Sequence, residues 1–132
     1  MSNAFYDSVA QVLEVDEVGF GTEFRQAPGW CSLQAFGLLV LMENDWKAPL
    51  DIVRLKAVRT VGDLYCEAFV AFAASLFGVP RSELSADTAY GSIPAWDSVN
   101  YLRLVMEAEK RFGTHYPLET IPGLRTIRDF LV

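Results

Sequence analysis

The second half of the sequence repeats most of the first at one offset, which changes by two residues near the start of each copy, and this duplication constrains the fold more than any other feature. Trp30 in the first half matches Trp96 in the second, and the same offset aligns most of each half. The other matched pairs include Thr22 and Thr88, Phe24 and Tyr90, Pro28 and Pro94, Ser32 and Ser98, Leu33 and Val99, Leu38 and Leu104, Glu43 and Glu109, Trp46 and Phe112, Arg59 and Arg125, Thr60 and Thr126, Val61 and Ile127, and Asp63 and Asp129. We therefore divide the chain into two repeats, residues 1–66 and 67–132.

Each repeat is small for an independent domain. A domain of roughly 60 residues buries only about 60% of its unfolded surface, so one repeat alone would be marginally stable. Hydrophobic residues make up 52% of the chain, which is enough for a core. We therefore expect the two repeats to pack on each other.

Apolar residues at helical spacing predict an all-α fold. The expected helices cover residues 5–13, 32–46 and 98–112, with short helices near 52–56 and 118–121. The last helix of each repeat is expected to begin after Thr60 or Thr126. Threonine suits the N-cap position, and the aspartate three residues later suits the first turn.

The junction between the repeats predicts one long helix. Between Val61 and Phe77 there is no proline, and the only glycine is Gly62, in the first turn. Gly78 follows directly and suits a helix end. We expect this helix to be the last of the first repeat and the first of the second. The alternative is two helices separated by a kink near Phe69.

Charge and hydropathy exclude several classes of function. The net charge of −6 argues against binding to nucleic acid. The apolar run over residues 38–42 is far too short to span a membrane. The first residues show no charged leader followed by an apolar stretch, so no signal peptide is expected. We expect a cytoplasmic protein with reduced thiols.

The residues that usually carry catalysis are scarce. His115 is the only histidine, and Cys31 and Cys66 do not have the spacing of a zinc site. No histidine or general base belongs to the motif around Cys31, which we interpret as a partly buried structural thiol. Cys66 is interpreted as a core residue. We therefore expect neither a metal site nor an enzyme.

The second repeat carries a recognisable motif. Asp97-Ser98-Val99 opens a helix that Glu109, followed by Phe112-Gly113, closes, and Leu124-Arg125-Thr126-Ile127 precedes the last helix. This pattern resembles the acyl carrier proteins, and the resemblance covers nearly all of residues 69–132. It implies two four-helix bundles in tandem, which would share the long central helix.

The resemblance also implies a modification. A phosphopantetheinyl transferase would attach 4′-phosphopantetheine to Ser98, and Asp97 would belong to the motif that the transferase recognises. Acyl groups would be held as thioesters on this arm for a fatty acid or polyketide type pathway, with acyl-loading and acyl-processing enzymes as partners. The structural alternative is that Ser98 is only an N-cap. Trp96 is interpreted as a loop aromatic that packs on the core.

The first repeat departs from the motif. Cys31 replaces the aspartate before Ser32, and the helix that follows is apolar nearly all round, with no charge before Glu43. Either Ser32 is a second, lesser attachment site, or the first repeat is degenerate. In the second case the apolar helix over residues 32–46 packs against the second repeat, another copy of the chain in a homodimer, or a partner enzyme. The alternative function for the whole chain is an unmodified adaptor that holds enzymes together.

Overall fold

The structure, a computed structural model, describes residues 3–131. The all-α prediction is confirmed: over this range the backbone forms helices, turns and two isolated β-bridges, and no strand. The α-helices are α1 (Ala4–Leu13), α2 (Ser32–Asn44), α3 (Ile52–Ala57), α4 (Val61–Phe77) and α5 (Ser98–Phe112). Short 3-10 helices occur at η1 (Phe24–Gln26), η2 (Arg81–Glu83), η3 (Leu118–Gly123) and η4 (Ile127–Phe130).

The helices expected near 118–121 and after Thr126 form as short 3-10 helices, and the helix expected over residues 32–46 ends two residues earlier. The segments after Pro117 and Thr126 form 3-10 helices rather than α-helices. Pro122 lies inside η3 and has no N–H to donate, which disfavours a regular α-helix there. α2 ends at Asn44 rather than Trp46, and Lys47 just beyond it has a left-handed backbone with φ of 55°.

α4 passes through the junction as one unbroken helix of 17 residues, so the kinked alternative was wrong. Its start is capped by Thr60, whose hydroxyl accepts a hydrogen bond from the Asp63 N–H at 3.1 Å. The Asp63 carboxylate accepts one from the Thr60 N–H, also at 3.1 Å. Gly78, with φ of 72°, ends the helix in a left-handed conformation that glycine adopts without strain.

Gly62 is needed at the first turn of α4 because another segment of backbone passes close to it. Its N–H donates a hydrogen bond to the Phe20 carbonyl at 2.7 Å. A Cβ at this position would lie 2.5 Å from the same oxygen, which is shorter than any side chain tolerates. The loop after α1 is thereby held against the start of α4.

The two halves repeat the same hydrogen bonds at matched positions. The Val61 N–H donates to the Thr22 carbonyl at 2.8 Å, and the Ile127 N–H donates to the Thr88 carbonyl at 3.2 Å. Further repeated features are the bridges Glu23–Thr60 and Ala89–Thr126 and the capping boxes Thr60–Asp63 and Thr126–Asp129. The sequence repeat is therefore matched by a repeat in local structure.

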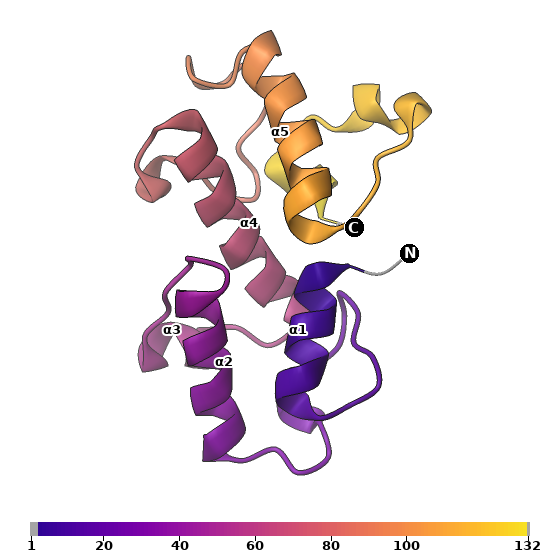
Figure 1. Cartoon of the computed structure of the whole chain (residues 1–132). Coiled ribbons are helices and arrows are strands. Elements are labelled where there is room, and N and C mark those ends of the chain that lie inside the picture. The colour runs from indigo at the N-terminus through magenta and orange to yellow at the C-terminus, as the bar shows by residue number, and fades with distance from the viewer. Residues whose placement is uncertain (1–2, 132) are drawn as a thin grey trace.

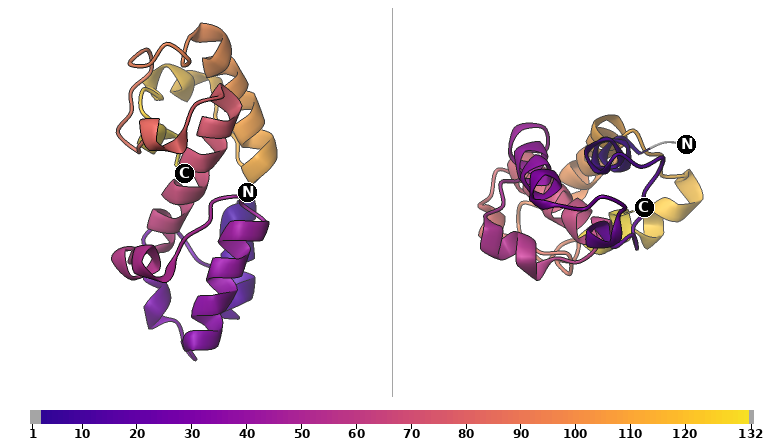
Figure 2. Two further views of the ribbon diagram at one scale, coloured as in Figure 1. Left: turned by 90° about the vertical axis from the view of Figure 1, so that its left-hand side faces the viewer. Right: turned by 90° about the horizontal axis from the view of Figure 1, so that it is seen from below.

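The elements are arranged around the two ends of α4 (Figures 1 and 2). α1, α2 and α3 surround its N-terminal part, and α5, η3 and η4 surround its C-terminal part. α2 and α5 run in opposite directions and meet at their C-terminal ends, so their N-termini point to opposite ends of the molecule (Figure 1). The serines that begin these two helices are therefore far apart.

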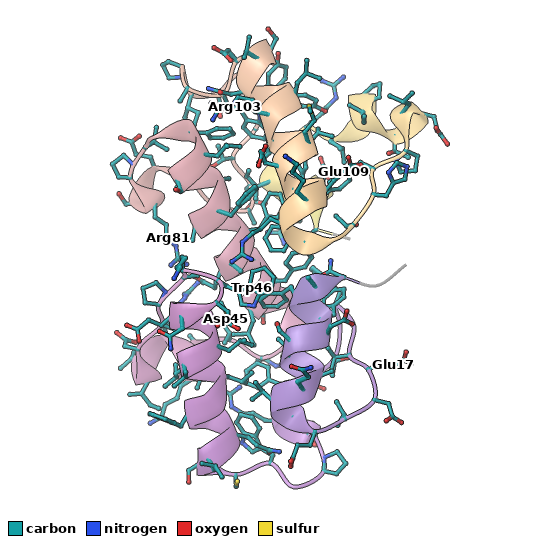
Figure 3. All side chains as sticks on the ribbon, in the orientation of Figure 1. Glu17, Asp45, Trp46, Arg81, Arg103 and Glu109 are labelled. Atoms are coloured by element: carbon teal, nitrogen blue, oxygen red, sulfur yellow. The ribbon has the colours of Figure 1, made fainter. Side chains whose placement is uncertain are left out.

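One aromatic core joins the two halves. Trp46, labelled in Figure 3 near the end of α2, stacks on Phe112 at the end of α5 with 5.2 Å between ring centroids. Phe5 of α1 contacts Trp46 at 5.1 Å, and Phe69 of α4 contacts Phe112 at 5.3 Å. All four side chains are at most 6% exposed. Packing between the repeats, expected from their small size, is thus observed.

None of the helices within residues 3–131 combines the length and the apolar character that crossing a membrane requires.

Candidate functional site

Ser98 is the first residue of α5, and its side chain is exposed. The N-cap is Asp97, whose carboxylate accepts a hydrogen bond from the Asn100 N–H at 2.9 Å. The Ser98 hydroxyl has no hydrogen-bond partner among residues 3–131. The structural alternative for Ser98, that it serves as an N-cap, was therefore wrong, because the aspartate before it has that role.

The loop before Ser98 is anchored by Trp96, which is fully buried, as predicted. Its ring lies 5.7 Å from that of Phe77 at the end of α4 and 6.5 Å from that of Tyr101. The side-chain amide of Asn100 donates to the Ala95 carbonyl at 2.6 Å and fixes the same turn. These contacts hold the start of α5 in a defined position while Ser98 itself stays open.

An apolar groove lies beside Ser98. Its volume is about 410 Å³, and Ser98 is one of its lining residues. The other lining residues are Tyr90, Tyr101, Leu102, Ile121, Pro122, Leu124 and Arg125, which come from α5, η3 and the adjoining loops. The groove therefore joins an exposed hydroxyl to a mostly apolar surface.

Tyr101 sets the wall of this groove. Its hydroxyl donates toward two backbone carbonyls, those of Ile121 at 2.5 Å and Leu124 at 2.9 Å. Burial raises the pKa of Tyr101, so the hydroxyl stays protonated and able to donate. The carbonyls of Ile121, within η3, and of Leu124, just after it, are thereby bound by a side chain that also lines the groove.

The start of α5 is suited to an anion. The first N–H groups of a helix have no partners within the helix and carry the positive end of its dipole. A phosphate joined to Ser98 would lie at these groups, where negative charge is stabilised. The residues present therefore fit a 4′-phosphopantetheine arm, with the phosphate at the helix end and the apolar groove beside it. Asp97 is exposed and would remain accessible to a modifying enzyme.

The corresponding site of the first repeat differs. Cys31 occupies the N-cap position of α2 without a side-chain cap, and Ser32 follows as an exposed residue with no hydrogen bond to its hydroxyl within the described chain. Cys31 is exposed, so the prediction of a partly buried thiol was wrong. The Cys31 side chain makes no capping hydrogen bond that would hold it against the helix.

The apolar residues of α5 divide between two faces. Val105 and Phe112 are buried, whereas Val99, Leu102 and Met106 are 65%, 60% and 61% exposed. Two apolar faces side by side give nearly the same helical spacing as one, so periodicity alone does not separate them. The exposed set forms an apolar strip that begins next to Ser98.

α2 exposes the same three repeat positions. Leu33, Phe36 and Val40 are 75%, 63% and 37% exposed. The prediction that this helix packs its apolar surface against the second repeat was wrong for these residues. Packing against another copy or against a partner enzyme stays a prediction.

Several charged residues of α5 contact other residues of this chain, so their side chains are not all free to bind a partner protein. The Arg111 guanidinium lies 4.3 Å from the ring centroid of Trp46 and donates to the Asp45 carbonyl. The Glu109 carboxylate accepts the Tyr116 N–H at 2.8 Å. Arg103 donates to the side chain of Asn100 at 2.9 Å and remains exposed.

An ion cluster around the buried Glu67 at the junction was missed in the sequence. The Glu67 carboxylate, on α4, is paired with Arg54 from α3 and with Arg81 from η2. Glu67 is 8% exposed, and Arg54 Nε lies 2.8 Å from its Oε1. The two arginines are far from Glu67 along the chain, so no local pattern indicates the contact. Cys66 beside it is half-buried, which partly fits its interpretation as a core residue.

Comparison with protein-family models, with curated proteins and with solved structures gives no match to this chain. Within residues 3–131, no three His, Cys, Asp or Glu side chains are grouped in a way that suits a metal ion.

Proposed function

We propose that this chain is an acyl carrier protein that bears 4′-phosphopantetheine on Ser98. The observation that carries the proposal is the exposed, unpartnered hydroxyl of Ser98 at the start of α5, next to an apolar groove of about 410 Å³. A transferase needs an accessible serine, and the product needs a place for a phosphate and for an acyl chain. The helix end and the groove supply these two places.

The arm would carry acyl groups as thioesters for a fatty acid or polyketide type pathway. Its partners would be a phosphopantetheinyl transferase and the acyl-loading and acyl-processing enzymes, in the cytoplasm. The exposed strip Val99, Leu102 and Met106 lies next to the attachment position, where such enzymes would have to bind. The carrier would need no catalytic group of its own, because the transferase activates the serine.

We also propose that the chain is built as two carrier-like four-helix bundles in tandem, residues 1–66 and 67–132, which share α4. The recurrence of hydrogen bonds and capping boxes at matched positions of the two repeats supports this division. The first bundle would be degenerate as a carrier. The missing cap at Cys31 and the opposite direction of α2 favour a supporting role over a second arm acting beside the first.

The modification is tested by incubating the protein with coenzyme A and a broad-specificity transferase and measuring the intact mass. The expected result is one phosphopantetheine adduct that Ser98→Ala abolishes. Ser32→Ala is the matched control, because it removes the equivalent serine of the first repeat, and the adduct should persist. Two adducts on the parent protein would contradict the degenerate first repeat.

The alternative function is an unmodified adaptor with carrier-like folds. The observation that favours it is the exposure of apolar residues at the same three positions in both repeats, Leu33, Phe36 and Val40 in the first and Val99, Leu102 and Met106 in the second. Exposed apolar patches commonly mark surfaces that bind other proteins. No adduct with several transferases would reject the carrier and favour the adaptor.

A further inference from the structure

The two repeats satisfy the same pair of carbonyls in two different ways. In the second repeat the hydroxyl of Tyr101 binds the carbonyls of Ile121 and Leu124. The equivalent carbonyls of the first repeat belong to Leu55 and Val58. They are bound by the Arg25 guanidinium, with Nη2 at 2.5 Å from the Leu55 oxygen and Nη1 at 2.6 Å from the Val58 oxygen.

The residues behind this difference form a reciprocal exchange. The position of Tyr101 is held by Ala35 in the first repeat, and the position of Arg25 is held by Gly91 in the second. Each repeat thus has a large hydrogen-bond donor at one of these two positions and a small residue at the other, and the two repeats use the positions in opposite ways. In the first repeat the donor comes from η1, and in the second it comes from α5.

Arg25 lies against the residues of the first repeat that are equivalent to the groove walls of the second. Its guanidinium carbon is 4.8 Å from the ring centroid of Phe24. Phe24, Leu55 and Val58 are the repeat equivalents of Tyr90, Ile121 and Leu124, which line the groove beside Ser98. The printed contrast lies at one of these positions: Phe24 is 0% exposed and its equivalent Tyr90 is 43% exposed, whereas Val58 and Leu124 are both buried, at 5% and 7%.

We propose that Arg25 closes the equivalent groove of the first repeat to apolar ligands and that the Gly91–Tyr101 pair keeps the groove of the second repeat open to one, an aliphatic acyl chain. An aliphatic chain entering the first repeat would have to displace the guanidinium and leave the buried Val58 carbonyl without its partner, which is costly. A chain entering the second repeat meets the ring of Tyr101 while its hydroxyl stays against the two carbonyls, which share its single proton. The inference rests on the proposed carrier function and assigns the acyl-holding role to one repeat.

The test attaches an aliphatic chain directly and bypasses the transferase. A cysteine is placed at position 32 or 98 by Ser32→Cys or Ser98→Cys, in a background of Cys31→Ser and Cys66→Ala. Hexyl methanethiosulfonate then forms a disulfide with the new thiol and releases methanesulfinate and a proton. Isotope-filtered NOEs report whether the hexyl chain contacts the protein, and the same variants labelled with a methylthio group serve as controls.

We expect NOEs from the chain at position 98 to Ile121 and Leu124, with a Tm about 3–5 °C above that of the methylthio control because the chain is buried. We expect no NOEs from the chain at position 32 to Leu55 or Val58. The exchange R25G with A35Y should produce them. If that double variant does not fold, R25A provides the same test.

Three results would overturn the proposal: no NOEs from position 98, NOEs from position 32 while Arg25 is present, or none from position 32 after the folded Arg25 variant is made. Failure of Ser98 to accept phosphopantetheine is a separate result, because the hexyl label needs no transferase. Suppose that the hexyl chain shows NOEs only from position 98 and that Ser98 never accepts phosphopantetheine. This result would support the difference between the two grooves and contradict the proposed carrier function.

Discussion

Trp46 and Phe112 occupy the same position in the two repeats, and their rings stack on each other with only 3° between the ring planes. A residue that meets its own repeat equivalent lies close to an axis that relates the two halves. The pair joins the end of α2 to the end of α5 in the middle of the molecule. The cores of the two halves are therefore continuous.

Phe112→Ala should destabilise the whole protein by about 3–5 kcal/mol, because it removes a fully buried ring that contacts both halves. Urea unfolding followed by far-UV circular dichroism should show one transition shifted to lower denaturant. Phe36→Ala is the control, since this side chain is 63% exposed, and it should change stability by less than about 0.5 kcal/mol. Separate unfolding of the two halves would contradict a shared core.

Glu67→Gln should cost about 1–3 kcal/mol, because it leaves Arg54 and Arg81 without their shared carboxylate. The value is below that of a fully buried pair, since the Arg54 side chain is 56% exposed. Glu107→Gln is the matched control: its pairing with Lys110 at 3.8 Å is on the surface and should contribute less than about 0.5 kcal/mol. Equal effects of the two substitutions on urea unfolding would count against the junction cluster.

The capping carboxylate of Asp129 should make stability depend on pH. Hydrogen bonds from the backbone N–H groups of Thr126 and Arg125 lower its pKa. A lowered pKa in the folded state stabilises the protein above the unfolded pKa of about 3.9, and this contribution is lost as the pH falls through the folded pKa. Asp129→Asn should therefore cost about 0.5–1 kcal/mol at pH 7 and little at about pH 2.

The control for this pH dependence is Asp16→Asn. The Asp16 side chain is exposed and makes no hydrogen bond within residues 3–131, so its substitution should change the unfolding free energy by less than about 0.5 kcal/mol. A constant difference between Asp129→Asn and the parent at pH 7 and pH 2 would reject the capping role of the carboxylate.

The two thiols should react with iodoacetamide at different rates. Cys31 is exposed, whereas Cys66 is half-buried and burial raises its pKa. Less thiolate and less access both slow alkylation, so at pH 8 we expect Cys66 to react at least about 10-fold more slowly. Peptide mass spectrometry measures the two rates. In denaturant the rates should converge, and a persistent difference would show that the fold is not its cause.

Local patterns predicted the helices that begin and end at strong signals. α5 begins at Ser98 and ends at Phe112, as expected from the motif and from Gly113. α4 is continuous because its sequence has no helix breaker between the Thr60 cap and Gly78. The 3-10 form of η3 and η4 was not foreseen, since short segments take their geometry from the contacts around them.

The site was predicted in part. The position of Ser98 at the start of α5 agrees with the sequence analysis, but the capping role of Asp97 was not separated from its place in the motif. The division of α5 into buried and exposed apolar faces was also missed. Spacing gives the period of a helix, whereas the neighbours in the fold decide which face is covered.

The sequence alone determined the duplication, the all-α composition of the chain and the continuity of α4, because each of these depends on residue spacing and on local caps. Only the tertiary structure decided that Trp46 stacks on Phe112, that Glu67 holds two distant arginines, and that Arg25 and Tyr101 bind equivalent carbonyls from opposite elements. These contacts join residues far apart along the chain. Their geometry depends on how the helices pack, which no local pattern specifies.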